Sequence, residues 1–222
     1  MNGLTSVTAR TKSSHSGRGR RRISRWRGFV RLAMLLTFAA SMLPASARAQ
    51  APIYEVTPED SSIKFDVESS VPIKGTFSTW TASMTFKSTD VRTGVLDIKI
   101  QADSVDTGSG MKNGKLKGKD FFDAKRAPQI TFVSTKVTQT GEDTFELEGD
   151  FTIRGVTKKE HLVLKVNGKG TGSGNITGTM AFDRKEYGMN SNIPFIKIAN
   201  RVEVNVDLAW KKVSGPPLVF QK

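Results

Sequence analysis

Residues 201–210 read RVEVNVDLAW, a stretch in which apolar side chains alternate with charged and amide side chains. Successive side chains of an extended strand point to opposite faces, so this pattern buries one face and leaves the other in water. The same alternation recurs in residues 145–154, which read FELEGDFTIR. From about residue 52 onward the chain is therefore predicted to consist of half-buried strands. Further alternating runs lie at 63–67, 80–86, 96–102, 130–132, 162–166 and 176–182.

Short turn signals separate these runs, among them Thr93-Gly94, Arg154-Gly155 and the glycine-rich residues 168–174. Consecutive strands with short connections pair in the antiparallel sense. Apolar faces that alternate so regularly need one common interior, and a closed barrel provides it while removing the sheet edges. The predicted fold is an all-β, antiparallel, up-and-down β-barrel of about eight strands in one domain.

One segment interrupts the alternation. Residues 109–123 read SGMKNGKLKGKDFFD, rich in glycine and lysine and ending in two adjacent phenylalanines. Adjacent side chains cannot both face the same side of a strand. We expect a loop with a short helix that folds over one end of the barrel.

The net charge of +13 is concentrated at the N-terminus. Residues 1–49 hold ten of the 34 lysines and arginines and no acidic residue, which leaves 24 basic against all 21 acidic residues in the rest of the chain. That remainder, at about +3, has a mixed and soluble surface without a stripe that would follow phosphates. Nucleic acid is therefore not an expected partner.

The first 49 residues have the order of a signal peptide. An arginine-rich segment ends at Arg31, residues 32–43 (LAMLLTFAASML) are apolar, and Pro44 precedes two small-residue cleavage sites, after Ala47 and after Ala49. Twelve apolar residues are too few for a helix that crosses roughly 30 Å of hydrocarbon. The sequence predicts a signal peptide at 1–49, a barrel at 50–212, a tail at 213–222 and export of the chain. An uncleaved anchor and the choice of cleavage site stay open.

The residues that carry most enzyme chemistry are scarce. There is no cysteine, and His161 is the one histidine after residue 49, on the polar side of its strand. Asp120 and Asp123 have helical i, i+3 spacing, which suits an acid–base pair, although capping of a short helix explains them better. The glycines of 168–174 lack the Lys-Ser/Thr ending of a phosphate loop. No catalytic residue, metal or cofactor is expected.

Several motifs in order resemble the YceI-like family, whose members are periplasmic, lipocalin-like barrels that bind polyisoprenoid lipids. They are KDFFD at 119–123 with PQITFVS at 128–134, GDFTIRGVTK at 149–158, RKEYGM at 184–189 and NRVEV at 200–204. The resemblance covers roughly residues 53–212. The chain departs from the family at Asp60-Ser61-Ser62, where members often have His-Ser, and at residues 112–116 (KNGKL), where many have R-D-x-H-L. Both departures put the head-group specificity in question.

The resemblance implies non-catalytic binding, storage or transport of an isoprenoid lipid, of polyprenyl or quinone type, in the apolar interior. Aromatic side chains on the apolar faces would contact the tail, and lysines of the interrupting segment would meet a polar head. The candidate ligand-binding residues are Phe65, Phe77, Trp80, Lys112, Lys115, Leu116, Phe121, Phe122, Phe132, Phe182 and Tyr187.

Two other functions stay open. A lipid-modifying hydrolase or isomerase would need two or more titratable groups that converge in the same cavity. A structural or partner-binding barrel would have a sealed interior and an exposed apolar patch. Apart from the lipid, a transient membrane contact and a homodimer also stay open.

Overall fold

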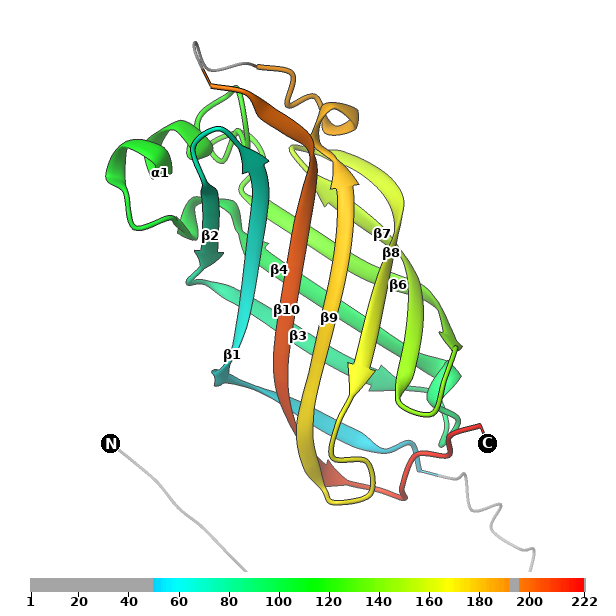
Figure 1. The fold of residues 1–222 in the computed structure, drawn as a ribbon. Helices are drawn as coiled ribbons and strands as arrows, with labels where there is room; N and C mark the ends of the chain where they lie inside the picture. The colour runs from blue at the N-terminus through cyan, green and yellow to red at the C-terminus, as the bar shows by residue number, and fades with distance from the viewer. Residues whose placement is uncertain (1–49, 192–195, 222) are drawn as a thin grey trace, which may run out of the picture. The chain divides into compact units, whose positions relative to one another are not determined.

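The computed structural model describes residues 50–191 and 196–221, which form an antiparallel sheet curled around an apolar core (Figure 1). The predicted signal peptide lies outside the described residues. The strands are β1 (Ile53–Ser69), β2 (Ile73–Phe77), β3 (Trp80–Phe86), β4 (Gly94–Gln101), β5 (Val105–Asp106), β6 (Gln129–Gln139), β7 (Thr144–Ile153), β8 (Val156–Val166), β9 (Ser173–Asp183) and β10 (Ile198–Ser214). The helices are α1 (Gly110–Lys117) and the 3₁₀ turns η1 (Val91–Thr93), η2 (Ala102–Ser104) and η3 (Arg184–Tyr187).

The strand order is β3-β4-β6-β7-β8-β9-β10-β1-β2-β5, with every pairing antiparallel. From β3 to β10 neighbours along the sheet follow each other along the chain, except that β5 and α1 come between β4 and β6. Strand β1 then pairs with β10, which brings the first strand beside the last. The prediction of an antiparallel, lipocalin-like β-barrel is confirmed. Ten strands form instead of about eight. The alternation did not reveal β5, which has two residues, or β2, whose central residue is Gly75.

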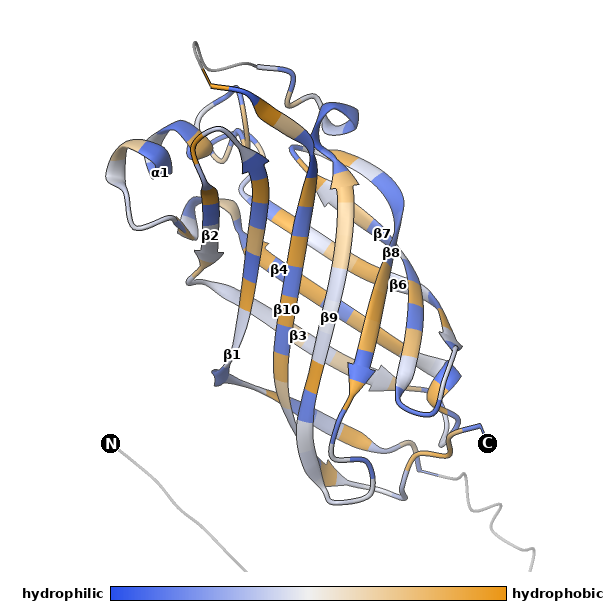
Figure 2. Ribbon diagram, in the orientation of Figure 1, coloured by the Kyte–Doolittle hydropathy of each residue, from blue (hydrophilic) through white to orange (hydrophobic). Residues whose placement is uncertain are grey.

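The alternation predicted from the sequence is visible along each long strand (Figure 2). In β7 every second residue is buried, from Phe145 to Ile153, and the residues between them are partly exposed. In β10 Val202, Val206, Leu208 and Trp210 are buried in the same way. The apolar faces of all the long strands therefore share one interior, because the sheet curls back on itself.

Two β-bulges are stabilised by serine hydroxyl groups. The β1–β10 register shifts between Thr57 and Ser62, and there Ser61 Oγ accepts a hydrogen bond from Ala209 N at 2.8 Å. The β6–β7 register shifts just after Ser134, whose buried hydroxyl accepts a hydrogen bond from Leu96 N at 2.9 Å. Each hydroxyl replaces a ladder partner that the bulge removes.

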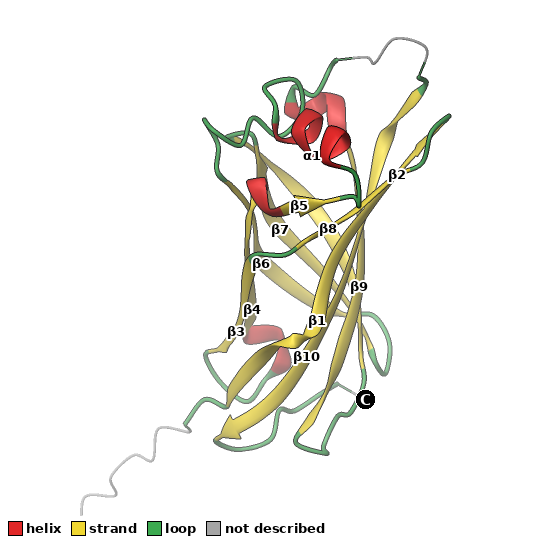
Figure 3. Ribbon diagram, turned by 90° about the vertical axis from the view of Figure 1, so that its left-hand side faces the viewer, coloured by secondary structure: helices red, strands yellow, loops and turns green. Residues whose placement is uncertain are grey.

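Different segments cover the two ends of the barrel (Figure 3). At one end lies α1, which begins after Ser109, whose hydroxyl accepts a hydrogen bond from Lys112 N, and which buries Leu116. The predicted short helix over a barrel end is thus present. At the opposite end lie the start of β1, the β8–β9 loop and the chain that follows β10.

Candidate ligand-binding cavity

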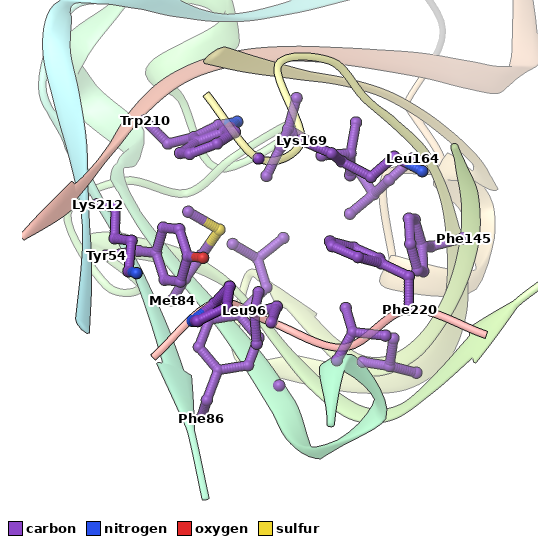
Figure 4. Close-up of a pocket in the computed structure, with 18 of the residues that line it drawn as sticks. Tyr54, Met84, Phe86, Leu96, Phe145, Leu164, Lys169, Trp210, Lys212 and Phe220 are labelled. Atoms are coloured by element: carbon purple, nitrogen blue, oxygen red, sulfur yellow. The ribbon is translucent and has the colours of Figure 1, made fainter. Parts of the chain in front are cut away.

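The interior contains a cavity of about 620 Å³ at the end opposite α1 (Figure 4). Its walls come from the ends of β1, β3, β4, β6, β7, β8, β9 and β10, and most of its lining is carbon. The lining residues are Tyr54, Met84, Phe86, Val91, Gly94, Val95, Leu96, Val137, Phe145, Leu147, Leu164, Val166, Lys169, Gly170, Thr171, Gly172, Ile176, Trp210, Lys212, Pro217, Leu218 and Phe220. Its size and apolar walls are those of a small-molecule or lipid site.

Three aromatic rings form one wall of the cavity. The Tyr54 ring packs edge-on against Trp210 and Phe86, with centroid separations of 5.5 and 5.6 Å. Burial raises the pKa of the Tyr54 phenol, an effect that the backbone of Leu218 partly offsets. Tyr54 therefore stays neutral at physiological pH, and the wall that it forms with Trp210 and Phe86 carries no charge.

The chain after β10 crosses the mouth of this cavity. Residues 215–221, the C-terminal strap, are tied to the barrel by backbone bonds from Val219 N to Thr89 O at 2.8 Å and from Val91 N to Val219 O at 3.3 Å. Gln221 N also donates to Gln139 Oε1 at 2.7 Å. The segment predicted as a tail is thus held against the barrel, and its apolar side chains line the cavity.

The rim opposite the strap is the glycine-rich β8–β9 loop. Gly168, Gly170 and Gly172 all have φ between +80° and +88°, a conformation that side-chain-bearing residues rarely adopt. The loop places Lys169 Nζ 2.6 Å from Asp143 Oδ1 and 4.9 Å from the centre of the Phe220 ring. The glycine-rich run is thus a hairpin loop, as predicted, and it positions a lysine at the cavity mouth.

Most of the predicted ligand-binding residues lie at the other end, beneath α1. Six of them surround a much smaller space of about 60 Å³: Phe65, Phe77, Leu116, Phe121, Phe122 and Phe182. The rings of Phe65, Phe77 and Phe122 pack together with centroid separations of 5.6 to 6.1 Å. The sequence therefore grouped these residues correctly, and side chains fill most of the space between them. Their role in ligand binding stays a prediction.

The other predicted residues are spread around that end and the middle of the barrel. Phe132 is buried on β6, Trp80 is partly exposed on β3, and Tyr187 is fully buried. Lys112 Nζ donates to Pro72 O at 2.9 Å, and Lys115 Nζ lies 2.7 Å from Asp120 Oδ2. Both lysines are on α1, at the far end from the 620 Å³ cavity.

The sequence did not indicate which end of the interior is hollow. Strand alternation placed Met84, Phe86, Phe145, Leu164 and Trp210 on apolar faces, which is where the structure has them. Alternation gives the side of the sheet and not the packing density, so it could not separate cavity-lining residues from core residues. The strap residue Phe220 carried no periodic signal.

No catalytic grouping is evident in the described part of the chain. His161 Nδ1 lies 2.8 Å from Glu146 Oε1 on the outer face, where both side chains are largely exposed. The hydrogen bond and charge of Lys115 lower the pKa of Asp120, the opposite of the shift that a general acid needs. No cluster of three or more potential metal ligands occurs among the described residues, and none of their helices is long and apolar enough to span a bilayer.

Residues 54–210 match the family model of the YceI-like domain, which covers more than half of the chain. The chain belongs to the YceI-like family. Among curated YceI-like relatives, Protein YceI of Escherichia coli O17:K52:H18 (strain UMN026 / ExPEC) is 32% identical over 139 residues, covering 61% of this chain and 72% of that protein. The UPF0312 protein of Pseudomonas savastanoi pv. phaseolicola (strain 1448A / Race 6) is 33% identical over 98 residues, and the chain spans 51% of its length.

Solved structures of other proteins have a similar fold. Burkholderia cenocepacia BcnA is 25% identical with a TM-score of 0.64, and the match covers 70% of this chain and 99% of BcnA. A polyisoprenoid binding domain from Saccharophagus degradans implicated in plant cell wall breakdown is 14% identical with a TM-score of 0.57, covering 73% of this chain and 99% of that domain. The second likeness bears on the fold alone. The matched family residues end at Trp210, so the C-terminal strap follows them.

Proposed function

We propose that the barrel binds the hydrocarbon tail of an isoprenoid lipid in the 620 Å³ cavity and does so without catalysis. The observation that carries the proposal is the cavity itself, whose walls are aromatic and aliphatic side chains of the strands. Burial of a hydrocarbon contributes roughly 0.8 kcal/mol per CH₂, so a tail needs little polar recognition in order to bind. Family membership and the polyisoprenoid binding domain of similar fold support the choice of lipid.

The polar head would lie at the mouth of the cavity, beside the strap and the β8–β9 loop. Lys169 and Lys212 line that mouth and supply positive charge there. An isoprenoid quinone or a polyprenyl phosphate would suit this site, since each has an apolar tail and a head group with hydrogen-bond acceptors. We further propose storage or transport of the lipid in the periplasm, after export by the predicted signal peptide.

A lipid-modifying enzyme is not favoured by the groups around the cavity. Catalysis by acid and base needs titratable side chains within reach of the reacting atoms. The ionisable groups of the lining are Tyr54, Lys169 and Lys212. Tyr54 has a raised pKa and Lys169 is paired with Asp143, an arrangement that suits binding better than proton transfer.

The test is lipid extraction from protein purified without detergent, followed by mass spectrometry. We expect a stoichiometric isoprenoid lipid with the native chain and a large loss with Val137→Phe, which adds a ring to a partly buried cavity-lining position. The matched control is Val163→Phe, which adds the same ring at a position that is 46% exposed. Absence of lipid from the native chain, or equal lipid in both variants, would contradict the proposal.

A further inference from the structure

The apolar interior is divided into two spaces by a layer of buried side chains. Along β4, Leu96 lines the 620 Å³ cavity and Ile100 lines the 60 Å³ space, while Ile98 between them lines neither. Along β9, Ile176 and Phe182 line the two spaces in the same order, and Met180 lies between them. The buried residues of this layer, the middle layer, line neither space and include Ile63, Ile98, Phe132, Leu162, Met180, Val206 and Leu208.

Phe132 closes the layer by lying across a glycine. A Cβ at Gly149 would be only 2.6 Å from Phe132 Cζ and 2.8 Å from Val133 O, so the ring rests directly on the Gly149 backbone. On β7, the strand that contains Gly149, Leu147 lines the large cavity and Phe151 lines the small space. The Phe132 ring therefore fills the position on β7 where an inward side chain would otherwise separate the two.

The volume of the large cavity sets how much tail it can hold. A dry cavity of about 150 Å³ holds the six carbons of benzene. By that measure the 620 Å³ cavity holds on the order of 25 carbons, or about five isoprene units. A longer tail would have to pass the middle layer or remain outside the mouth.

We infer that the middle layer is a length stop that restricts this barrel to lipids with short isoprenoid tails, about four to five isoprene units. This inference rests on the proposed function and deepens it. Phe132 and Met180 are then specificity-determining residues, because their side chains fill the interior directly behind the inner lining of the cavity, and a longer tail would have to displace them. The aromatic cluster beneath α1 lies behind them and blocks the remainder of the interior.

In the test, the full chain takes up prenols from detergent micelles that contain equal amounts of farnesol, geranylgeraniol and solanesol. These prenols have three, four and nine isoprene units. Native mass spectrometry gives the relative occupancy of the three prenols. Partition of each prenol into the micelles is the same for every variant. A change in the ratio between variants therefore reports only the protein.

We expect the native chain to hold geranylgeraniol over solanesol. Phe132→Leu and Met180→Ala should each shift the solanesol to geranylgeraniol ratio upward by on the order of tenfold, since each buried isoprene unit adds to the affinity. Leu147→Phe narrows the cavity from its inner side and should shift occupancy from geranylgeraniol toward farnesol. The matched control, Val163→Ala on the outer face, should leave both ratios unchanged.

Two middle-layer variants are used because either could fold poorly, and circular dichroism identifies a variant that does. A native chain that takes solanesol as readily as geranylgeraniol, with ratios that no variant changes, would overturn the length stop and leave the proposed function standing. A native chain that holds none of the three prenols would overturn both.

Discussion

Phe220 of the C-terminal strap packs on Phe145 of β7, with the ring centroids 6.1 Å apart. This contact joins the last described residues of the chain to the wall of the cavity, because both side chains are part of its lining. The strap also forms a short parallel bridge at Asp90 and Val219. A lipid that enters from this end would therefore have to displace the strap or pass beside it.

Removal of the Phe220 ring should loosen the strap and speed the release of bound lipid. An aromatic pair contributes about 0.5–1.5 kcal/mol beyond its buried area, so we expect Phe220→Ala to raise the dissociation rate by about fivefold. Stopped-flow transfer of a fluorescent prenyl probe to acceptor vesicles measures the rate. Val219→Ala is the matched control, since the Val219 side chain is 60% exposed and its backbone bonds remain. Equal rates for both variants would show that the strap does not limit release.

Gly149→Ala should destabilise the barrel, since the new methyl group would meet the Phe132 ring and the Val133 carbonyl oxygen at less than 3 Å. The ring can shift but the carbonyl belongs to the ladder, so we expect a loss of about 1–3 kcal/mol in the free energy of unfolding. Urea denaturation measures it. In contrast, Gly114→Ala in α1, where nothing lies within 4 Å of the new Cβ, should gain about 0.5–1 kcal/mol. A neutral Gly149→Ala would mean that Phe132 packs elsewhere.

Ser134→Ala should lower the free energy of unfolding, although it removes only one oxygen atom. Ser134 is buried, and its hydroxyl is the acceptor for Leu96 N at the β6 bulge. A buried N–H without an acceptor costs about 1–3 kcal/mol. We expect a loss of that size in urea denaturation, together with faster amide exchange at Leu96. Thr135→Ala, which removes a hydroxyl at an exposed position beside it, should change stability by less than about 0.5 kcal/mol.

The strand pattern could be predicted from the sequence because the period-two alternation of residues such as Val202 and Trp210 follows directly from strand geometry. The two short strands at the sheet edge could not, since β5 has only two residues and β2 has Gly75, without a side chain, at its central position. The candidate site was harder still. Phe65, Phe182 and Trp210 all read as apolar inward residues of alternating strands, yet only Trp210 lines the large cavity. Which rings meet each other depends on three-dimensional packing, and this is not encoded in local periodicity.

Tyr187 should make the stability of the barrel fall at high pH. Burial, and then the hydrogen bond from Tyr187 Oη to Glu160 Oε1 at 2.6 Å, raise the pKa of the phenol above its ordinary value of 10.0. Above pH 10 the unfolded chain releases this proton while the folded chain keeps it. The unfolded state then binds fewer protons, so the free energy of unfolding decreases as the pH rises.

Tyr187→Phe isolates this effect. Near pH 7 the variant should be less stable by about 0.5–1.5 kcal/mol, because it lacks the hydrogen bond to Glu160. Above pH 10 the difference between the two proteins should shrink by up to about 1.4 kcal/mol per pH unit, since only the native chain retains the phenol proton. Urea denaturation of both chains from pH 7 to 11 measures the difference. Lysine and Tyr54 titrations are common to both chains and cancel, so a difference that stays constant across this range would show that Tyr187 ionises in the folded state.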